Sequence, residues 1–224
     1  MDTISKDDFV EVDYTGKLAE TGEVFDTTVP EEAKKAGIES KNLSPVIIQV
    51  GKNWLLPCVE KQLEGKEVGT TYNMKLSPEE GFGKKSTKFI QLIATRKFRQ
   101  QDVVPMPGMQ VEIDGLIGMI RTVSGGRAIV DFNHPLAGKA LEYDVIVRRK
   151  VTDAKEKIDA LFKILGLKAD AKVEADKATI MADLPPEVQK GLQEEITKSI
   201  PEVKTVDFLK PEKNEKPAQK PEQK

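Results

Sequence analysis

Aromatic side chains and one carboxylate are the residues of this sequence that could form a reactive pocket. Tyr14, Asp26, Phe82 and Tyr143 lie far apart in the chain, and each falls in or beside a segment with the pattern of a strand. A sheet wrapped round a short helix would bring such side chains together at one end. We expect an apolar pocket with aromatic walls and a single carboxylate. Apolar residues of neighbouring segments would complete it, namely Phe25, Val46, Leu55 and Leu56.

The elements that would position these side chains are short strands and one central helix. Residues Phe9 to Leu18 alternate between apolar and polar side chains, which is the period of a half-buried strand. Within Trp54 to Glu64, apolar residues recur every four positions and predict a short helix with one buried face. Pro57 falls in its first turn, where its missing N–H does little harm. Further predicted elements are strands at Val46 to Val50, Tyr72 to Leu76 and Leu141 to Arg149, and one or two helical turns at Pro30 to Gly37.

Two motifs bracket a segment that has its own strand pattern. Ser77 to Gly83 (Ser-Pro-Glu-Glu-Gly-Phe-Gly) ends one series of strands, and Asn133 to Gly138 (Asn-His-Pro-Leu-Ala-Gly) opens another. Between them, strand-like runs are separated by Asp114-Gly115 and Gly125-Gly126, dipeptides typical of hairpin turns. We therefore predict a domain at residues 84–133, inserted into a discontinuous domain of residues 1–83 and 134–151. Its predicted strands are Phe89 to Ala94, Gln110 to Ile113, Leu116 to Val123 and Arg127 to Phe132.

A third domain is predicted at residues 152–209. It should contain two amphipathic helices, the first from an N-cap at Thr152 to a stop at Gly166 and the second from Pro186 to Ile200, with a hairpin between them and a final strand. So short a unit has a thin core, and we expect it to pack on the first domain or on its own copy. Residues 210–224 contain no large apolar side chain, and we expect this tail to be disordered.

Composition excludes several classes of function. With 35 Lys and Arg against 37 Asp and Glu, the net charge of −2 gives no basic surface for nucleic acid or an acidic membrane. Cys58 is the single cysteine, so no internal disulfide can form and a zinc site lacks thiolates. The charged start and the absence of a long apolar run predict a soluble, cytoplasmic protein.

Several motifs resemble those of the FKBP-type peptidyl-prolyl isomerases in order and spacing. They are Tyr-Thr-Gly-Lys-Leu from Tyr14, Phe-Asp-Thr-Thr from Phe25, Val-Gly-Lys and Trp-Leu-Leu-Pro between Val50 and Pro57, and the Ser77 to Gly83 motif. The run from Asn133 to Val145, placed after an insert of this size, is similar to the SlyD-like branch, whose flap loop carries an extra chaperone domain. The resemblance covers roughly Ser5 to Val151.

The resemblance implies an α+β fold: an antiparallel half-barrel wrapped on a short helix, a β-rich domain inserted in the flap, and a small α/β C-terminal domain. It also implies rotation of Xaa-Pro bonds without a covalent intermediate, metal or cofactor. The catalytic residues would be Tyr14, Asp26, Phe82 and Tyr143, with Asp26 polarising the pocket and Tyr143 serving chiefly as a wall. The substrate-binding residues would be Phe25, Val46, Leu55, Leu56, Leu136 and Ala137.

The insert is expected to bind unfolded or proline-containing polypeptides. The only other partner we predict is a second copy of the chain, bound through the C-terminal domain. Its apolar side chains exceed what so small a domain can bury, and methionines adapt to varied partners. Val104, Met106 and Met109 are the residues we assign to this surface, with Phe98, Val103, Ile117 and Met119 as further members. The alternative is that these side chains form the core of the insert.

Three functions stay open at this stage. The first is an isomerase that also holds unfolded chains, the second a passive holdase that uses the same pocket, and the third a structural adaptor that docks through its C-terminal domain. The only histidine, His134, should order the hinge into Pro135, since isomerisation requires no proton transfer. SlyD-like proteins often end in a metal-binding tail rich in histidine and cysteine, whereas this tail is rich in Lys, Pro and Glu, so we predict no metal site.

Overall fold

The computed structural model describes residues 2–39 and 43–210. These residues fall into two compact units, one formed by residues 2–13, 44–71 and 146–210 and the other by residues 14–39, 43 and 72–145. The division differs from the predicted domain boundaries, which stay a prediction. The predicted disordered tail lies outside the described residues, except for Lys210.

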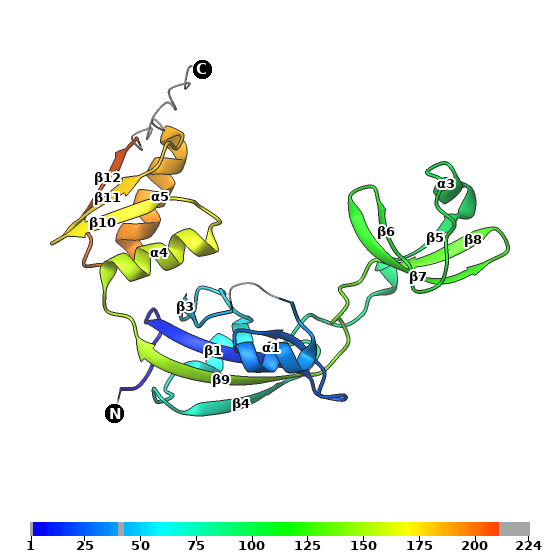
Figure 1. Ribbon diagram of the computed structural model, residues 1–224, viewed down its shortest axis with the longest axis horizontal. Coiled ribbons are helices and arrows are strands. Elements are labelled where there is room, and N and C mark those ends of the chain that lie inside the picture. The colour runs from blue at the N-terminus through cyan, green and yellow to red at the C-terminus, as the bar shows by residue number, and fades with distance from the viewer. Residues whose placement is uncertain (1, 40–42, 211–224) are drawn as a thin grey trace, which may run out of the picture. The chain divides into compact units, whose positions relative to one another are not determined.

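The four strands predicted for the first domain are confirmed, and together with a strand at Val24–Thr27 that was not predicted they form one five-stranded sheet (Figure 1). Its order is β2-β1-β9-β4, with β3 also paired to β1. The long strand β1 is shared by two antiparallel partners, because Phe9 to Val12 pair with β3 and Thr15 to Lys17 pair with β2. The strands are β1 (Phe9–Leu18), β2 (Val24–Thr27), β3 (Val46–Gln49), β4 (Thr71–Leu76) and β9 (Leu141–Lys150).

Two short helices accompany this sheet, and both begin with proline. Helix α1 spans Pro30–Ala36 and ends at Gly37, which adopts the left-handed conformation common at the end of a helix, with a φ of 68°. Helix α2 spans Pro57–Leu63 and buries Val59 and Leu63. Proline suits the first helical position because its N–H would have no partner there.

Between β4 and β9 the chain folds into a separate four-stranded antiparallel sheet, which we call the β5–β8 segment. The strand order is β5-β8-β7-β6. Both predicted hairpin dipeptides lie in turns with positive φ, Asp114-Gly115 at 53° and 78° and Gly125-Gly126 at 56° and 73°. A short helix, α3, was not predicted, and it buries Phe98 against the sheet. The elements are a 3-10 turn (Thr87–Phe89), β5 (Ile90–Ala94), α3 (Thr95–Arg99), β6 (Gln110–Ile113), β7 (Leu116–Ser124) and β8 (Arg127–Asp131).

After β9 the chain forms what we call the C-terminal α/β part. Strands β10, β11 and β12 make a sheet in that order, β10 antiparallel and β12 parallel to β11, and helices α4 and α5 pack against it (Figure 1). The predicted N-cap at Thr152 is wrong by one residue. Asp153 caps α4, because its carboxylate accepts a hydrogen bond from the backbone N–H of Glu156 at 2.9 Å. The elements are α4 (Ala154–Ile164), β10 (Asp170–Glu174), β11 (Lys177–Met181), α5 (Pro186–Ser199) and β12 (Thr205–Leu209).

The core of this C-terminal part includes residues from the start of the chain. Phe9 of β1 and Val151 are buried in the same cluster as the inward faces of α4 and α5, and Ile47 and Trp54 pack against it. The thin core expected for so short a unit is therefore extended by side chains of the preceding sheet and loop.

Candidate active site

Tyr14 of β1, Asp26 of β2 and Tyr143 of β9 meet across three neighbouring strands. The Tyr14 hydroxyl donates a hydrogen bond to Oδ2 of Asp26 at 2.9 Å, and the Tyr14 and Tyr143 rings lie 6.1 Å apart between centroids. The Phe25 ring meets Tyr143 edge to face at 5.8 Å. Tyr143 is buried, whereas Asp26 is exposed, so a carboxylate that solvent and a ligand can reach lies beside the two tyrosines, and the Phe25 ring packs against Tyr143.

The surroundings of this group raise the pKa of both phenols further above neutral pH. Burial is the main cause, and the charge of Asp26 adds to it, raising the pKa of Tyr143 to about 12. The same two effects, with the hydrogen bond to Asp26, raise the pKa of Tyr14 well above its ordinary value. The site therefore offers neutral hydroxyls and aromatic faces beside one carboxylate, and no proton transfer is built into it.

Threonines fix the pairing of β1 with β2 beneath these rings. The hydroxyls of Thr15 and Thr27 lie 2.8 Å apart, and Thr28 accepts a hydrogen bond from the N–H of Tyr14 at 2.9 Å. At Gly16 the register shifts, and a Cβ there would lie 2.8 Å from the Phe25 ring and 3.1 Å from the Tyr143 ring. Glycine is needed at this position because the two rings close directly over the backbone of β1.

The Asn133 to Gly138 motif is held against the Ser77 to Gly83 motif. The Phe82 and His134 rings stack with centroids 4.3 Å apart and planes within 3°, and the N–H of Gly138 bonds to the carbonyl of Gly83 at 2.7 Å. Nδ1 of His134 accepts the N–H of Leu136 at 3.2 Å. Ala137 is buried and Leu136 half-buried. His134 thus orders the turn that presents Leu136, which agrees with the structural role expected for it.

The other predicted pocket residues, Val46, Leu55 and Leu56, belong to the unit that contains β3 and α2, and all three are half-buried there. Their membership of the same pocket as Tyr14 stays a prediction. The loop before α2 is held by Glu60, whose buried carboxylate accepts hydrogen bonds from the N–H groups of Gly51, Asn53 and Leu55 at 2.8, 2.9 and 2.7 Å. Sequence analysis missed Glu60; an acidic residue in the first turn of a helix is the signal that could have found it.

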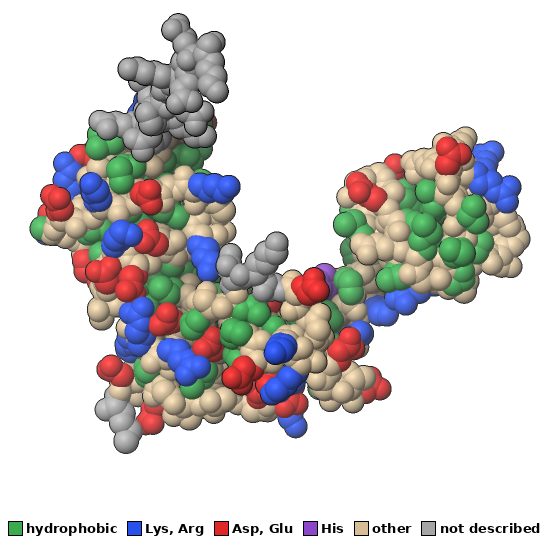
Figure 2. Space-filling model, in the orientation of Figure 1, with side chains coloured by type: hydrophobic (Ala, Val, Ile, Leu, Met, Phe, Trp, Pro, Cys, Tyr) green, Lys and Arg blue, Asp and Glu red, His purple; other side chains and the backbone are tan. Residues whose placement is uncertain are grey.

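The β5–β8 segment buries one face of its sheet, and apolar side chains also gather on its surface (Figure 2). Of the predicted client-binding residues, Val104 and Met106 are 72% and 60% exposed, whereas Met109 packs partly against the core. Phe98 is buried there, and Val103 packs beside it. Ile117 and Met119 are exposed and were predicted, while further exposed apolar residues were not: Phe89, Ile90, Leu92, Leu116 and Ile129.

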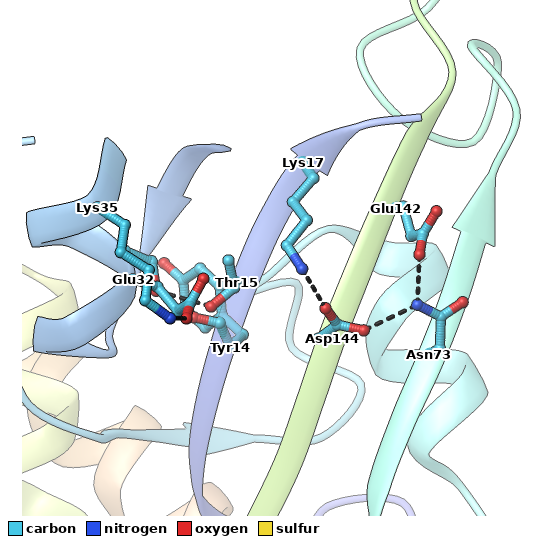
Figure 3. Close-up of polar contacts among 9 residues, drawn as sticks. Tyr14, Thr15, Lys17, Glu32, Lys35, Asn73, Glu142 and Asp144 are labelled. Atoms are coloured by element: carbon cyan, nitrogen blue, oxygen red, sulfur yellow. Dashed lines mark hydrogen bonds and ion pairs between the residues drawn. The ribbon is translucent and has the colours of Figure 1, made fainter. Parts of the chain in front are cut away.

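A polar network on the solvent side of the sheet was also missed (Figure 3). Lys17 donates to Asp144 at 2.6 Å, and the amide of Asn73 donates to Asp144 and Glu142 at 2.8 and 2.6 Å. The hydrogen bond from Lys17 is the main reason that the pKa of Asp144 lies below its ordinary value. Because side chains alternate along a strand, this network faces away from neighbouring Tyr143 and ties β1, β9 and β4 together.

Neither a metal cluster nor a membrane span was found in the described part of the chain. Within residues 2–39 and 43–210, no three His, Cys, Asp or Glu side chains are grouped so that they could hold a metal ion. In the same residues, every helix is too short or too polar to cross a bilayer.

Comparison with known proteins gives two family matches and several relatives. Residues 2–99 match the family described as FKBP-type peptidyl-prolyl cis-trans isomerase, and residues 91–136 match the family described as FKBP26, IF domain. The chain is 35% identical over 147 residues to a short-type peptidyl-prolyl cis-trans isomerase of Methanocaldococcus jannaschii, covering 65% of this chain and 92% of that protein.

Two bacterial relatives match a shorter part of the chain. The similarity to the FKBP-type isomerase SlyD of Haemophilus influenzae is 36% identity over 108 residues, which is 46% of this chain and 56% of SlyD. An FKBP-type 16 kDa isomerase of Escherichia coli is 32% identical over 110 residues, or 47% of this chain and 74% of that protein.

Proposed function

Because the chain belongs to the FKBP-type peptidyl-prolyl cis-trans isomerase family, we propose that it rotates Xaa-Pro bonds in unfolded or partly folded polypeptides and also holds these chains as a chaperone. The observation that carries the first part is the group formed by Tyr14, Asp26 and Tyr143 with Phe25 against it. The catalytic set is proposed to be Tyr14, Asp26, Phe82 and Tyr143, and the pocket to be completed by Val46, Leu55, Leu56, Leu136 and Ala137.

The reaction requires only that the planar amide be destabilised relative to the twisted one. Amide resonance opposes rotation with a barrier of roughly 18–20 kcal/mol. The planar amide carries more charge on its carbonyl oxygen than the twisted form, so aromatic walls that exclude water disfavour the planar state more strongly. Each ~1.4 kcal/mol of this difference accelerates rotation about tenfold.

Asp26 is the group we place beside the twisting bond. Its carboxylate is exposed and held by the Tyr14 hydroxyl, so its orientation is fixed before substrate arrives. Tyr143 is buried between Tyr14 and Phe25, which suits a wall against the proline ring. Neither role consumes a proton or a cofactor.

The isomerase role is tested with a proline-containing tetrapeptide nitroanilide. We expect Asp26→Ala and Tyr143→Ala each to lower kcat/KM about tenfold or more, while circular dichroism stays unchanged. Glu23→Ala, an exposed carboxylate close to Asp26 in sequence, is the matched control and should have no effect. Wild-type rates in both site variants would refute the assignment.

The chaperone role is proposed for the exposed apolar face of the β5–β8 segment. Leu92 and Ile129 lie side by side on neighbouring strands and are both exposed, which gives an unfolded chain adjoining apolar side chains to contact. We propose that this segment is inserted in the flap of the isomerase domain, and that Val104, Met106 and Met109 contribute to the same surface.

The two roles can be separated by replacing exposed leucines. Leu92→Ser should leave tetrapeptide isomerisation unchanged but reduce the acceleration of a proline-limited refolding reaction several-fold. Leu209→Ser removes a leucine of nearly equal exposure, 55% against 58%, from a different sheet and should change neither rate. Equal refolding rates in Leu92→Ser and wild type would refute the chaperone surface. A wild-type protein that isomerises the tetrapeptide slowly but still suppresses aggregation would favour a passive holdase.

A homodimer through the C-terminal α/β part is a further proposal, as is a cytoplasmic location. Ile164, Leu165 and Val188 are exposed together around a groove between α4 and α5, and an apolar surface of this kind suits a second copy of the chain. Sedimentation at increasing protein concentration tests it; a monomer at all concentrations would refute it.

A further inference from the structure

The loop before α2 is irregular and is fixed from one side by a single carboxylate. Gly51 to Leu56 forms no helix or strand, and Asn53 adopts a left-handed φ of 59°. The carboxylate of Glu60 holds three N–H groups of this loop. Leu56 is the N-cap of α2, and its carbonyl accepts hydrogen bonds from the N–H groups of Val59 and Glu60 at 2.8 and 3.2 Å. On this side, Leu55 and Leu56 are therefore held by α2 itself.

The opposite side of the same loop is held by the C-terminal α/β part. The Trp54 side chain packs against its core, and the Trp54 ring meets the Phe9 ring edge to face at 5.9 Å and 80°. Trp54 also helps to line the groove between α4 and α5, a cavity of about 400 Å³, together with Leu161 and Leu192.

Two polar contacts join the same elements. Lys52 forms an ion pair with Glu195 of α5 at 2.8 Å. The side-chain amide of Gln49, which is buried, donates to the carbonyl of Ser199 at the end of α5 at 3.4 Å. The residues before Leu55 are thus attached to α5 at three successive points, Gln49, Lys52 and Trp54, and they share one backbone with Leu55 and Leu56.

We propose that Trp54 is a positioning residue of the isomerase site, through which the C-terminal α/β part sets the conformation of Leu55 and Leu56. The inference rests on the proposed function, because it takes these two leucines as the floor of the substrate pocket. Misplacing a binding group by about 1 Å can cost up to about a hundredfold in rate, so a loop anchored on one side only would bind substrate less well.

The first test compares three full-length variants by tetrapeptide isomerisation. Trp54→Ala should lower kcat/KM about tenfold, mainly through a higher KM, because the floor contributes to binding. Trp54→Phe keeps a ring in the groove and should recover wild-type kcat/KM within about twofold. Phe208→Ala removes a ring from the same core without touching the loop and is the control for a purely structural loss. Equal kcat/KM in Trp54→Ala and wild type, or equal losses in Trp54→Ala and Phe208→Ala, would overturn the proposal.

An ion-pair exchange decides the matter if Trp54→Ala does not fold. Lys52→Glu and Glu195→Lys each place like charges together and should each lower kcat/KM about threefold, and the double exchange should restore it. Glu195 lies on α5, outside the loop. A loss of isomerase activity in Glu195→Lys, and its recovery when Lys52→Glu is added, therefore requires the coupling that we propose. No loss in either single variant, or no rescue in the double variant, would overturn it.

Trp54 also supplies its own optical probe, because it is the only tryptophan of the chain. Its fluorescence emission should shift when the tetrapeptide is titrated into wild-type protein, and it should be red-shifted in Glu195→Lys without peptide. A wild-type protein that isomerises the peptide without any change in Trp54 emission would contradict the coupling. A wild-type protein without isomerase activity would instead refute the proposed function, so the two failures are distinguishable.

Discussion

Replacing Gly16 by alanine should disturb the candidate site with a single methyl group. The added Cβ would lie 2.8 Å from the Phe25 ring and 3.1 Å from the Tyr143 ring. Carbon atoms pack at about 3.5–4.0 Å, so the Phe25 ring must move by roughly 0.7 Å or more. Such overpacking costs about 1–3 kcal/mol. We expect the free energy of unfolding to fall by this amount in urea titrations.

The same displacement should be measurable in catalysis. If the Phe25 and Tyr143 rings separate, the wall loses part of a contact that is typically stabilising by about 0.5–1.5 kcal/mol. We therefore expect kcat/KM for a proline tetrapeptide to fall by up to about tenfold, since ~1.4 kcal/mol corresponds to one power of ten. The hydrogen bond between Tyr14 and Asp26 does not involve Gly16. We therefore attribute the expected fall in kcat/KM to the displaced rings and not to the loss of this hydrogen bond.

Two further variants make the result specific. Phe25→Leu shortens the side chain that the new methyl group meets, so the double variant should lose less stability than the sum of the single variants. Gly191→Ala adds a methyl group inside α5 that meets no atom within 4 Å beyond its own stretch of the helix, and it should stabilise the protein by about 0.5–1 kcal/mol. If Gly16→Ala has the unfolding free energy of wild type, the close approach of the rings to β1 is incorrect.

Three other perturbations have expected outcomes. Tyr143 has a folded pKa of about 12, so its stabilisation is fully present below its ordinary pKa of roughly 10 and is lost as pH rises from 10 to 12. The fall in unfolding free energy over this range, measured in urea titrations, should be about 2–3 kcal/mol smaller in Tyr143→Phe, which keeps the contribution of Tyr14. An equal loss in both proteins would contradict this. Glu60→Ala leaves three N–H groups without their acceptor and should lower the free energy of unfolding by about 3 kcal/mol or more. The midpoint of thermal unfolding should fall accordingly, whereas a wild-type midpoint would mean that water replaces the carboxylate. Burial opposes ionisation of Asp131, but hydrogen bonds from Asn133 and Arg121 outweigh it and hold its pKa below the ordinary value. Its stabilisation is therefore present above pH ~4 and lost as the pH falls. Asp131→Asn should lower the free energy of unfolding by about 1–3 kcal/mol at neutral pH, measured by urea unfolding. The variant should also lose less stability than wild type as the pH is lowered below ~4, and an equal loss would mean that other groups cause it.

Most strands and turns could be predicted because each depends on neighbouring residues. The alternation of Phe9 to Leu18 indicates a half-buried strand, and the dipeptides Asp114-Gly115 and Gly125-Gly126 permit the positive φ angles that the hairpins adopt. Helix α3 was missed because five residues are too few for a helical period to emerge, and only Phe98 is buried. Asp153 was passed over for Thr152 because either residue can cap a helix.

The contacts between distant parts of the chain could not be predicted in the same way. Tyr14 and Asp26 were assigned to one site, but their hydrogen bond depends on the register between β1 and β2, which the sequence does not specify. Trp54 was read as the start of a helix, whereas it lies before α2 and packs against the C-terminal α/β part. An aromatic residue has no periodic signature that tells which distant core will bury it.

The order of strands in the five-stranded sheet has a consequence for synthesis on the ribosome. Strand β1 lies next to β9, whose first residue is Leu141, so a nascent chain must emerge well beyond the β5–β8 segment before this part of the sheet can close. The β5–β8 segment has all its strand partners between Ile90 and Asp131 and can form first. Because long-range strand pairing is slow, the edge of β1 stays unpaired for that interval. The chain therefore passes through a stage of its own synthesis in which the β5–β8 segment is folded and the five-stranded sheet is not.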